Sequence, residues 1–188
     1  MSTRSRLGLI GAVAAAAIAI GVGSAGVSGV ASAATAAPAI SPNAGTVHGC
    51  VFETDNGHYV TAVGDGGRTT DVIHTDATQI GAWEKFTLVR ADAGLLDDHY
   101  GILTGSGHYL TAVSGGGRTT DVIHSDATQL QSWEDFTLVP LGDGVYNIKT
   151  YNGHYLTAVD GGGLTTDAIH SDATRPSSWE LFFISCGH

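Results

Sequence analysis

The chain repeats itself three times, and this repetition limits its possible folds more than any other feature of the sequence. Laid without gaps on Thr54 to Val89, the segment Thr104 to Val139 is identical at 26 of 36 positions, and Thr150 to Ser185 follows the same pattern. Self-similarity with a period of 46 to 50 residues is typical of one supersecondary unit copied in tandem. We therefore expect any site within the unit to occur in three equivalent places.

Each repeat divides into four short strands, because glycine-rich turns separate segments in which apolar and polar residues alternate. Glycine in such turns, for example Gly115 to Gly117, supplies positive φ without steric cost. The expected strands are Val47–Glu53, His58–Val63, Asp71–Thr75, Trp83–Val89, Tyr100–Thr104, His108–Val113, Asp121–Ser125, Trp133–Val139, Val145–Thr150, His154–Val159, Asp167–Ser171 and Trp179–Ser185. Since no later stretch keeps a 3.6-residue apolar period, we expect an all-β fold.

Twelve short strands in three four-strand units fit a β-trefoil, a six-stranded barrel closed at one end by three hairpins. A propeller blade also has four strands, but three blades fall below the usual range of about four to eight. We therefore predict a β-trefoil over residues 46–188, with repeats at about 54–89, 104–139 and 150–185.

The first 33 residues have the pattern of a cleavable secretory signal peptide. Arg4 and Arg6 supply a positive start, Leu7 to Val22 is apolar, and Ala31-Ser32-Ala33 is a small-residue cleavage site. A membrane helix needs about 20 strongly apolar residues, and glycines dilute this run. We expect cleavage after Ala33 or Ala36, a flexible leader over residues 34–45 and a secreted, monomeric mature domain without a membrane span.

The mature chain is strongly acidic. The full sequence has 8 Lys and Arg against 18 Asp and Glu, and loss of Arg4 and Arg6 leaves 6 basic residues and a formal charge of −12. Such a surface repels phosphate backbones and anionic head groups, which argues against nucleic acid and membranes as partners. Neutral ligands and cations remain.

Cys50 and Cys186 are the two cysteines of the sequence. A widely spaced pair in an exported chain suggests one disulfide, and barrel closure would bring the first strand beside the last. We predict a Cys50–Cys186 clasp that joins the termini; two buried free thiols are the alternative.

The motifs Gly107 to Ala112 (GHYLTA) and Trp133 to Leu138 (WEDFTL) resemble the fascin-like β-trefoil repeat, and the resemblance covers the whole mature domain. β-Trefoils include actin bundlers, lectins, carbohydrate-binding modules and protease inhibitors, so the fold alone does not decide the function. Within that superfamily the chain is most similar to secreted bacterial modules that bind glucans. This resemblance implies three sites, each with a Trp and a Glu.

The tryptophan of each repeat is a candidate for ligand contact. In the expected strand that begins at Trp133, Phe136 and Leu138 share one face, and Trp133 lies on the other face with Asp135 and Thr137. If the apolar face fills the barrel, the indole points outward. An outward indole beside a carboxylate suits a pyranose, whose C–H face packs on the ring while its hydroxyls donate to the carboxylate.

The predicted carbohydrate-binding residues are therefore Trp83, Glu84, Trp133, Glu134, Trp179 and Glu180. The alternative is structural, with each Trp covered by the loop before it. The third copy departs from the pattern, because Arg175-Pro176 replaces Gln-Leu in that loop and Leu181 and Phe183 replace polar residues. Its site is thus either altered or covered.

Other repeated residues have weaker signals. Tyrosines fall out of step with the apolar residues of their strands, but we interpret them as structural: Tyr59, Tyr109 and Tyr155. Histidines also recur, at His58, His108 and His154 and at His74, His124 and His170. Beside Asp they suggest a metal site, but hydrogen-bonded loop histidines are the simpler interpretation, so we predict no metal and no cofactor.

No catalytic constellation emerges, and we predict a non-enzymatic protein. Asp97-Asp98-His99 occurs once and is most simply a solvated loop. The leading hypothesis is a secreted, lectin-like module that binds a polysaccharide of the β-glucan class. Alternatives are an actin-type or other protein-interaction β-trefoil, a secreted protease inhibitor acting through Ala91 to Asp98 or Leu141 to Gly144, and a histidine-based metal or pH sensor.

Overall fold

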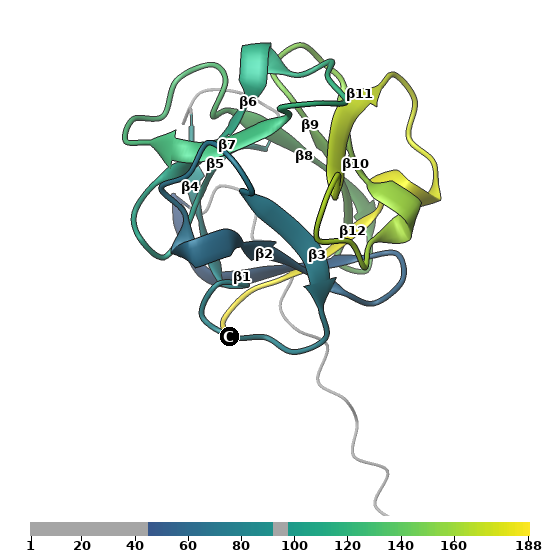
Figure 1. The fold of residues 1–188 in the computed structure, drawn as a ribbon, viewed down its shortest axis with the longest axis horizontal. Helices are drawn as coiled ribbons and strands as arrows, with labels where there is room; N and C mark the ends of the chain where they lie inside the picture. The colour runs from purple at the N-terminus through teal and green to yellow at the C-terminus, as the bar shows by residue number, and fades with distance from the viewer. Residues whose placement is uncertain (1–44, 92–97) are drawn as a thin grey trace, which may run out of the picture. The chain divides into compact units, whose positions relative to one another are not determined.

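The structure is a computed structural model that describes residues 45–91 and 98–188 of the chain (Figure 1). The expected signal peptide, residues 34–44 of the expected leader and residues 92–97 of the candidate inhibitor segment Ala91 to Asp98 lie outside the described residues. Each repeat forms one lobe of four strands. Lobe 1 has β1 (Thr46–Thr54), β2 (Tyr59–Ala62), β3 (Ile73–Ala77) and β4 (Phe86–Arg90). Lobe 2 has β5 (His99–Leu103), β6 (Tyr109–Ala112), β7 (Ile123–Ala127) and β8 (Phe136–Gly142), and lobe 3 has β9 (Val145–Lys149), β10 (Tyr155–Ala158), β11 (Ile169–Ala173) and β12 (Phe182–Ser185).

The strand pairing closes a barrel of six strands. β1 pairs with β4, β4 with β5, β5 with β8, β8 with β9, β9 with β12, and β12 with β1, all antiparallel. The other strands form the hairpins β2–β3, β6–β7 and β10–β11. This arrangement is a β-trefoil, as the repeats predict.

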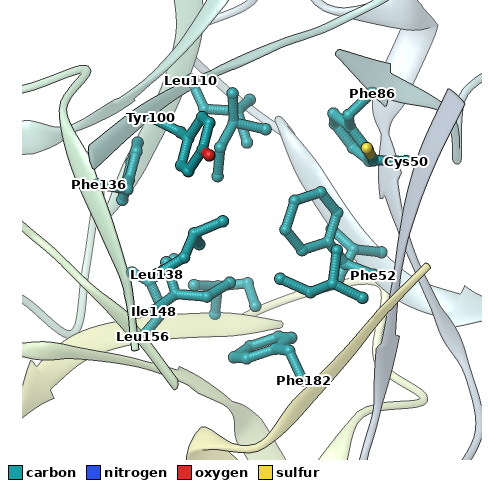
Figure 2. Close-up of a cluster of buried hydrophobic side chains, with 14 of the residues drawn as sticks. Cys50, Phe52, Phe86, Tyr100, Leu110, Phe136, Leu138, Ile148, Leu156 and Phe182 are labelled. Atoms are coloured by element: carbon teal, nitrogen blue, oxygen red, sulfur yellow. The ribbon is translucent and has the colours of Figure 1, made fainter. Parts of the chain in front are cut away.

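Phenylalanines at equivalent positions fill the barrel. Phe86, Phe136 and Phe182 start the fourth strand of each lobe and are fully buried, because the apolar face of each strand turns inward. Figure 2 shows their rings pointing into one interior together with the ring of Phe52 and the side chain of Leu138. The strand alternation seen in the sequence therefore identifies the core.

Short turns follow β2, β6 and β10: the 3-10 segments η1 (Val63–Asp65), η2 (Val113–Gly115) and η3 (Val159–Gly161). The glycine after each turn lies against the next lobe, since a Cβ at Gly66 would collide with Thr104 Oγ1. The same collision occurs between Gly116 and Thr150 and between Gly162 and Thr54. These three glycines are needed for close approach of the lobes.

Backbone hydrogen bonds join each glycine turn to the next lobe. Gly67 N–H donates to Ser125 O (2.6 Å), and Ser125 N–H donates to Arg68 O (2.8 Å). Equivalent pairs join Gly117 and Arg118 to Ser171, and Gly163 and Leu164 to Thr75. The three lobes are thus linked in a ring that returns to its start.

The predicted disulfide is confirmed. Cys50 in β1 and Cys186 after β12 are bonded and buried, 136 residues apart in sequence. The bond joins lobe 1 to lobe 3 and is typical of an oxidising compartment. Across the described ranges, no helix is long and apolar enough to cross a membrane.

Two sets of strand boundaries differ from those expected. The third strand of each lobe begins at Ile rather than at Asp two residues earlier, because Asp71, Asp121 and Asp167 have left-handed φ angles of 51°, 50° and 53°. The fourth strand begins at Phe, three residues after Trp. The tryptophans therefore lie in turns and not in the strands predicted to contain them.

Candidate functional site

The three indoles are exposed at equivalent positions. Trp83, Trp133 and Trp179 keep 48%, 47% and 43% of their surface accessible. The prediction that the indoles point outward assumed that each tryptophan begins a strand, and this assumption is wrong because none of them belongs to a strand. Trp179 lies in the 3-10 segment η4 (Ser178–Glu180), and the other two lie in hydrogen-bonded turns. The turns, rather than strand parity, present the rings to solvent.

The main chain of each turn is fixed at the tryptophan in lobes 1 and 2. Ala62 N–H donates to Trp83 O (2.9 Å), and Ala112 N–H donates to Trp133 O (2.8 Å). These donors end β2 and β6, so the hairpin of each lobe holds the turn in place. A ring presented from a fixed backbone loses less freedom on binding than one on a loose loop.

The glutamate after each tryptophan is buried, which the sequence analysis did not foresee. Glu84, Glu134 and Glu180 are 7%, 6% and 4% exposed. In lobe 1, Thr61 Oγ1 donates to Glu84 Oε1 (2.7 Å) and Gly81 N–H donates to Glu84 Oε2 (2.7 Å). The same two bonds recur from Thr111 and Gln131 to Glu134, and from Thr157 and Ser177 to Glu180. The carboxylate therefore ties the tryptophan loop to the hairpin.

Glu180 accepts one more hydrogen bond than its counterparts, from Ser177 Oγ at 2.8 Å. Burial raises the pKa of Glu180, but the bonds from Thr157 and from the side chain and backbone of Ser177 outweigh burial. The pKa of this carboxyl consequently lies below its ordinary value. We call the buried Glu with its hydrogen bonds to the hairpin and the loop the glutamate clamp. The sequence signal for it is the Thr that recurs in the second strand of each lobe, at Thr61, Thr111 and Thr157.

A hollow of about 410 Å³ lies beside Trp133. Its lining residues are Ala127, Thr128, Gln129, Gln131, Ser132, Trp133 and Glu134. The volume falls within the range of small-molecule sites, about 300 to 1,000 Å³. Amide and hydroxyl groups therefore surround one indole, which is a mixture of surfaces that suits a hydroxylated ring.

Lobe 3 has a different tryptophan site. A Cβ placed on Gly161 would lie 3.6 Å from Trp179 Cδ1, so the indole lies beside the η3 turn of its own lobe. Arg175 and Pro176 occupy the loop, and Phe183 is 37% exposed. Trp179 nevertheless keeps nearly the same exposure as its counterparts.

The repeated tyrosines and the second set of repeated histidines, His74, His124 and His170, have local partners. Tyr59, Tyr109 and Tyr155 are half-buried and pair across their hairpins with Ala77, Ala127 and Ala173. His74 Nε2 lies 2.7 Å from Asp71 Oδ1, and the same pair recurs as His124 with Asp121 and His170 with Asp167. The described residues contain no group of three or more His, Cys, Asp or Glu that could hold a metal ion.

A larger hollow, about 560 Å³, is bounded by the three Thr-Thr-Asp segments that precede the third strand of each lobe. Every Asp on its rim is hydrogen-bonded to a histidine, and Asp71 and Asp121 also lie within ion-pair distance of Arg68 and Arg118. Because these carboxylates are already paired, the greater volume does not make this hollow a better candidate ligand site than the hollow beside Trp133.

No protein-family model matches the chain, and no curated protein matches its sequence. Solved structures do match. The designed threefold-symmetric protein ThreeFoil shares 15% identity at a TM-score of 0.59, over 76% of this chain and 99% of that one. The BEL β-trefoil shares 10% identity at a TM-score of 0.57, over 74% of this chain and 93% of that one. The exo-β-1,3-galactanase 1,3Gal43A from Clostridium thermocellum shares 13% identity at 0.61, over 76% of this chain and 30% of that one. These likenesses establish the fold alone.

Proposed function

We propose that this chain is a secreted, non-catalytic module that binds a polysaccharide of the β-glucan class at up to three tryptophan sites. The observation that supports it is the contrast between each indole and its neighbours. Phe residues three positions later are fully buried, while the larger tryptophans stay nearly half exposed in all three lobes. A ligand that covers such a ring removes apolar surface from water, which favours binding.

The chemistry of the site suits a neutral sugar. The C–H face of a pyranose packs on an indole, and the surrounding hydroxyls need hydrogen-bond partners. Gln129, Gln131 and Ser132 supply such partners beside Trp133. Glu134 lines the same hollow, and each of its oxygens has a second lone pair that can accept a bond from a sugar hydroxyl.

The resemblance to glucan-binding β-trefoils assigns Trp and Glu to the same sites, and the fold of the galactanase match is consistent with a role in polysaccharide recognition. One exposed indole gives weak binding. Three sites on one rigid domain increase the apparent affinity for a polymer, because the second contact becomes intramolecular. We therefore expect affinity to rise steeply with chain length of the glucan.

Titration calorimetry with soluble β-glucan tests the proposal. We expect Trp83→Ala and Trp133→Ala each to weaken binding several-fold and the double variant to weaken it by tenfold or more. Trp133→Phe is the matched control, since it keeps an aromatic face. Far-UV circular dichroism and thermal unfolding show whether each variant is folded. Undiminished binding by a folded double variant would contradict the proposed sites.

A further inference from the structure

A hollow of a different kind lies between lobes 2 and 3. Its volume is about 540 Å³. It is bounded by Asp98 and His99 at the start of β5, by residues 137–140 of β8, and by Lys149, Thr150, Tyr151 and Gly153 at the β9–β10 turn. We call it the interlobe cleft. Unlike the tryptophans, three of its side chains occur in one lobe alone: His99, Lys149 and Tyr151.

The cleft lies along a row of residues that are paired in the strand register across four strands. His99 pairs with Thr137, Thr137 with Lys149, and Lys149 with Tyr155. The other lobes have the same row with different residues. Leu103 and Glu53 occupy the position of Lys149, and they pair with Tyr109 and Tyr59. A cation is therefore present at this position in one lobe of three.

Lys149 has no carboxylate within ion-pair distance among the described residues. Its Nζ lies 5.6 Å from the centroid of the Tyr155 ring, an arrangement that holds the ammonium over an aromatic face. Although the mature chain has three times as many acidic as basic residues and repels anions as a whole, a lysine outside an ion pair supplies a local positive charge. Its charge is available to a ligand in the cleft.

The second polar group is a histidine with a fixed orientation. His99 Nδ1 lies 3.0 Å and 3.1 Å from the two carboxylate oxygens of Asp135. With its Nδ1 proton donated to Asp135, the ring has Nε2 left to form a bond with another molecule. Asp98 is paired with Arg90 at 3.5 Å. The sequence had suggested only a solvated loop at Asp98 and His99.

An aromatic ring borders the same cleft. Tyr151 is 62% exposed, and the equivalent residues of the other lobes are Asp55 and Gly105. Tyr151, Lys149 and His99 thus all border one hollow of ligand size. The first offers a face for a sugar ring, and the second offers a counter-charge for an anionic substituent.

We infer that the interlobe cleft binds a sugar ring that carries a carboxylate, that is, a uronic acid unit of a polysaccharide. Tyr151 covers one face of the ring, Lys149 pairs with the carboxylate, and His99 Nε2 bonds to a hydroxyl. The inference rests on the proposed function in taking the ligand to be a glycan. It uses none of the three tryptophans, so the two sites can be tested separately.

The test titrates the full mature chain with glucuronic acid oligosaccharides, with glucose oligosaccharides of equal length, and with inorganic phosphate. The variants Lys149→Leu and Tyr151→Gly introduce residues that the other lobes already have at these positions, so both should fold. We expect each to weaken binding of the uronate tenfold or more and to leave glucose binding unchanged. Arg118→Gln is the charge-matched control and should change neither.

A chain with all three tryptophans replaced by alanine separates the two proposals. It should lose glucose binding and keep uronate binding. The inference is overturned if uronate affinity is unchanged in Lys149→Leu, if it disappears with the tryptophans, if the wild-type chain binds no uronate, or if phosphate competes equally well. If the wild-type chain binds uronate oligosaccharides but no glucose oligosaccharides, that result contradicts the proposed function and leaves this inference intact.

Discussion

Lobes 2 and 3 contain the same tryptophan turn in two different surroundings. In both, a buried Glu accepts hydrogen bonds from a Thr of the hairpin and from the loop backbone. In lobe 2 the loop leaves a hollow lined by amides and hydroxyls, whereas in lobe 3 the loop carries Arg175 and Pro176. The shared residues fix the turn, and the variable loop decides what the indole can bind.

The largest expected effect on stability comes from the Cys50–Cys186 disulfide, which joins lobe 3 to lobe 1 and has no counterpart in lobe 2. Cys50→Ser with Cys186→Ser should lower the free energy of unfolding by about 5 kcal/mol, because the bond closes a long loop and limits the unfolded chain. Chemical denaturation of the wild type and the double variant measures this difference. A change below about 1 kcal/mol would show that the loop entropy is not the source of its effect.

Replacing a buried phenylalanine should lower the free energy of unfolding by the same amount in lobes 2 and 3. Phe136→Ala and Phe182→Ala each leave a cavity in a closed core and should cost about 3 to 5 kcal/mol. Urea denaturation gives both values. If one variant cost less than half of the other, the barrel would be less symmetric than its strand pairing indicates.

The glutamate clamp should matter more in lobe 3, because Glu180 accepts an additional bond from Ser177. Glu134→Gln should cost about 1 to 3 kcal/mol, and Glu180→Gln should cost more. Equal losses would show that the Ser177 bond contributes nothing.

The Glu180 clamp also predicts a pH dependence. The pKa of Glu180 is lowered in the folded state, so its contribution to stability is present above the ordinary value of 4.5 and is lost as the pH falls through the folded pKa. Thermal unfolding from pH 7 downward should therefore show a steeper loss of stability for the wild type than for Glu180→Gln. Parallel curves would contradict this assignment.

The smallest effect on stability is expected at the indoles. Trp133→Ala and Trp179→Ala remove rings that are nearly half exposed, so each should cost about 1 kcal/mol or less. If the altered loop of lobe 3 prevents binding, only the first variant should weaken glucan binding. Titration of both variants sharpens the comparison of the lobes.

The sequence predicts the trefoil, its core and its disulfide because these depend on repetition and on alternation, which are visible along the chain. It misplaces the start of the third and fourth strands, since a left-handed Asp71 and a turn at Trp83 are local backbone choices that alternation does not encode. The burial of Glu84 depends on Thr61, 23 residues away, and the cleft depends on residues from two lobes. Such contacts require the fold before they can be seen.

The ring of hydrogen bonds between lobes has a consequence for the origin of the chain. Each lobe offers the backbone groups of its glycine turn to one neighbour and those of Thr75, Ser125 or Ser171 to the other. A single repeat would leave both sets without partners. An ancestral peptide of one repeat should therefore have been stable only as a trimer of identical chains, and joining three copies would have made that assembly independent of concentration.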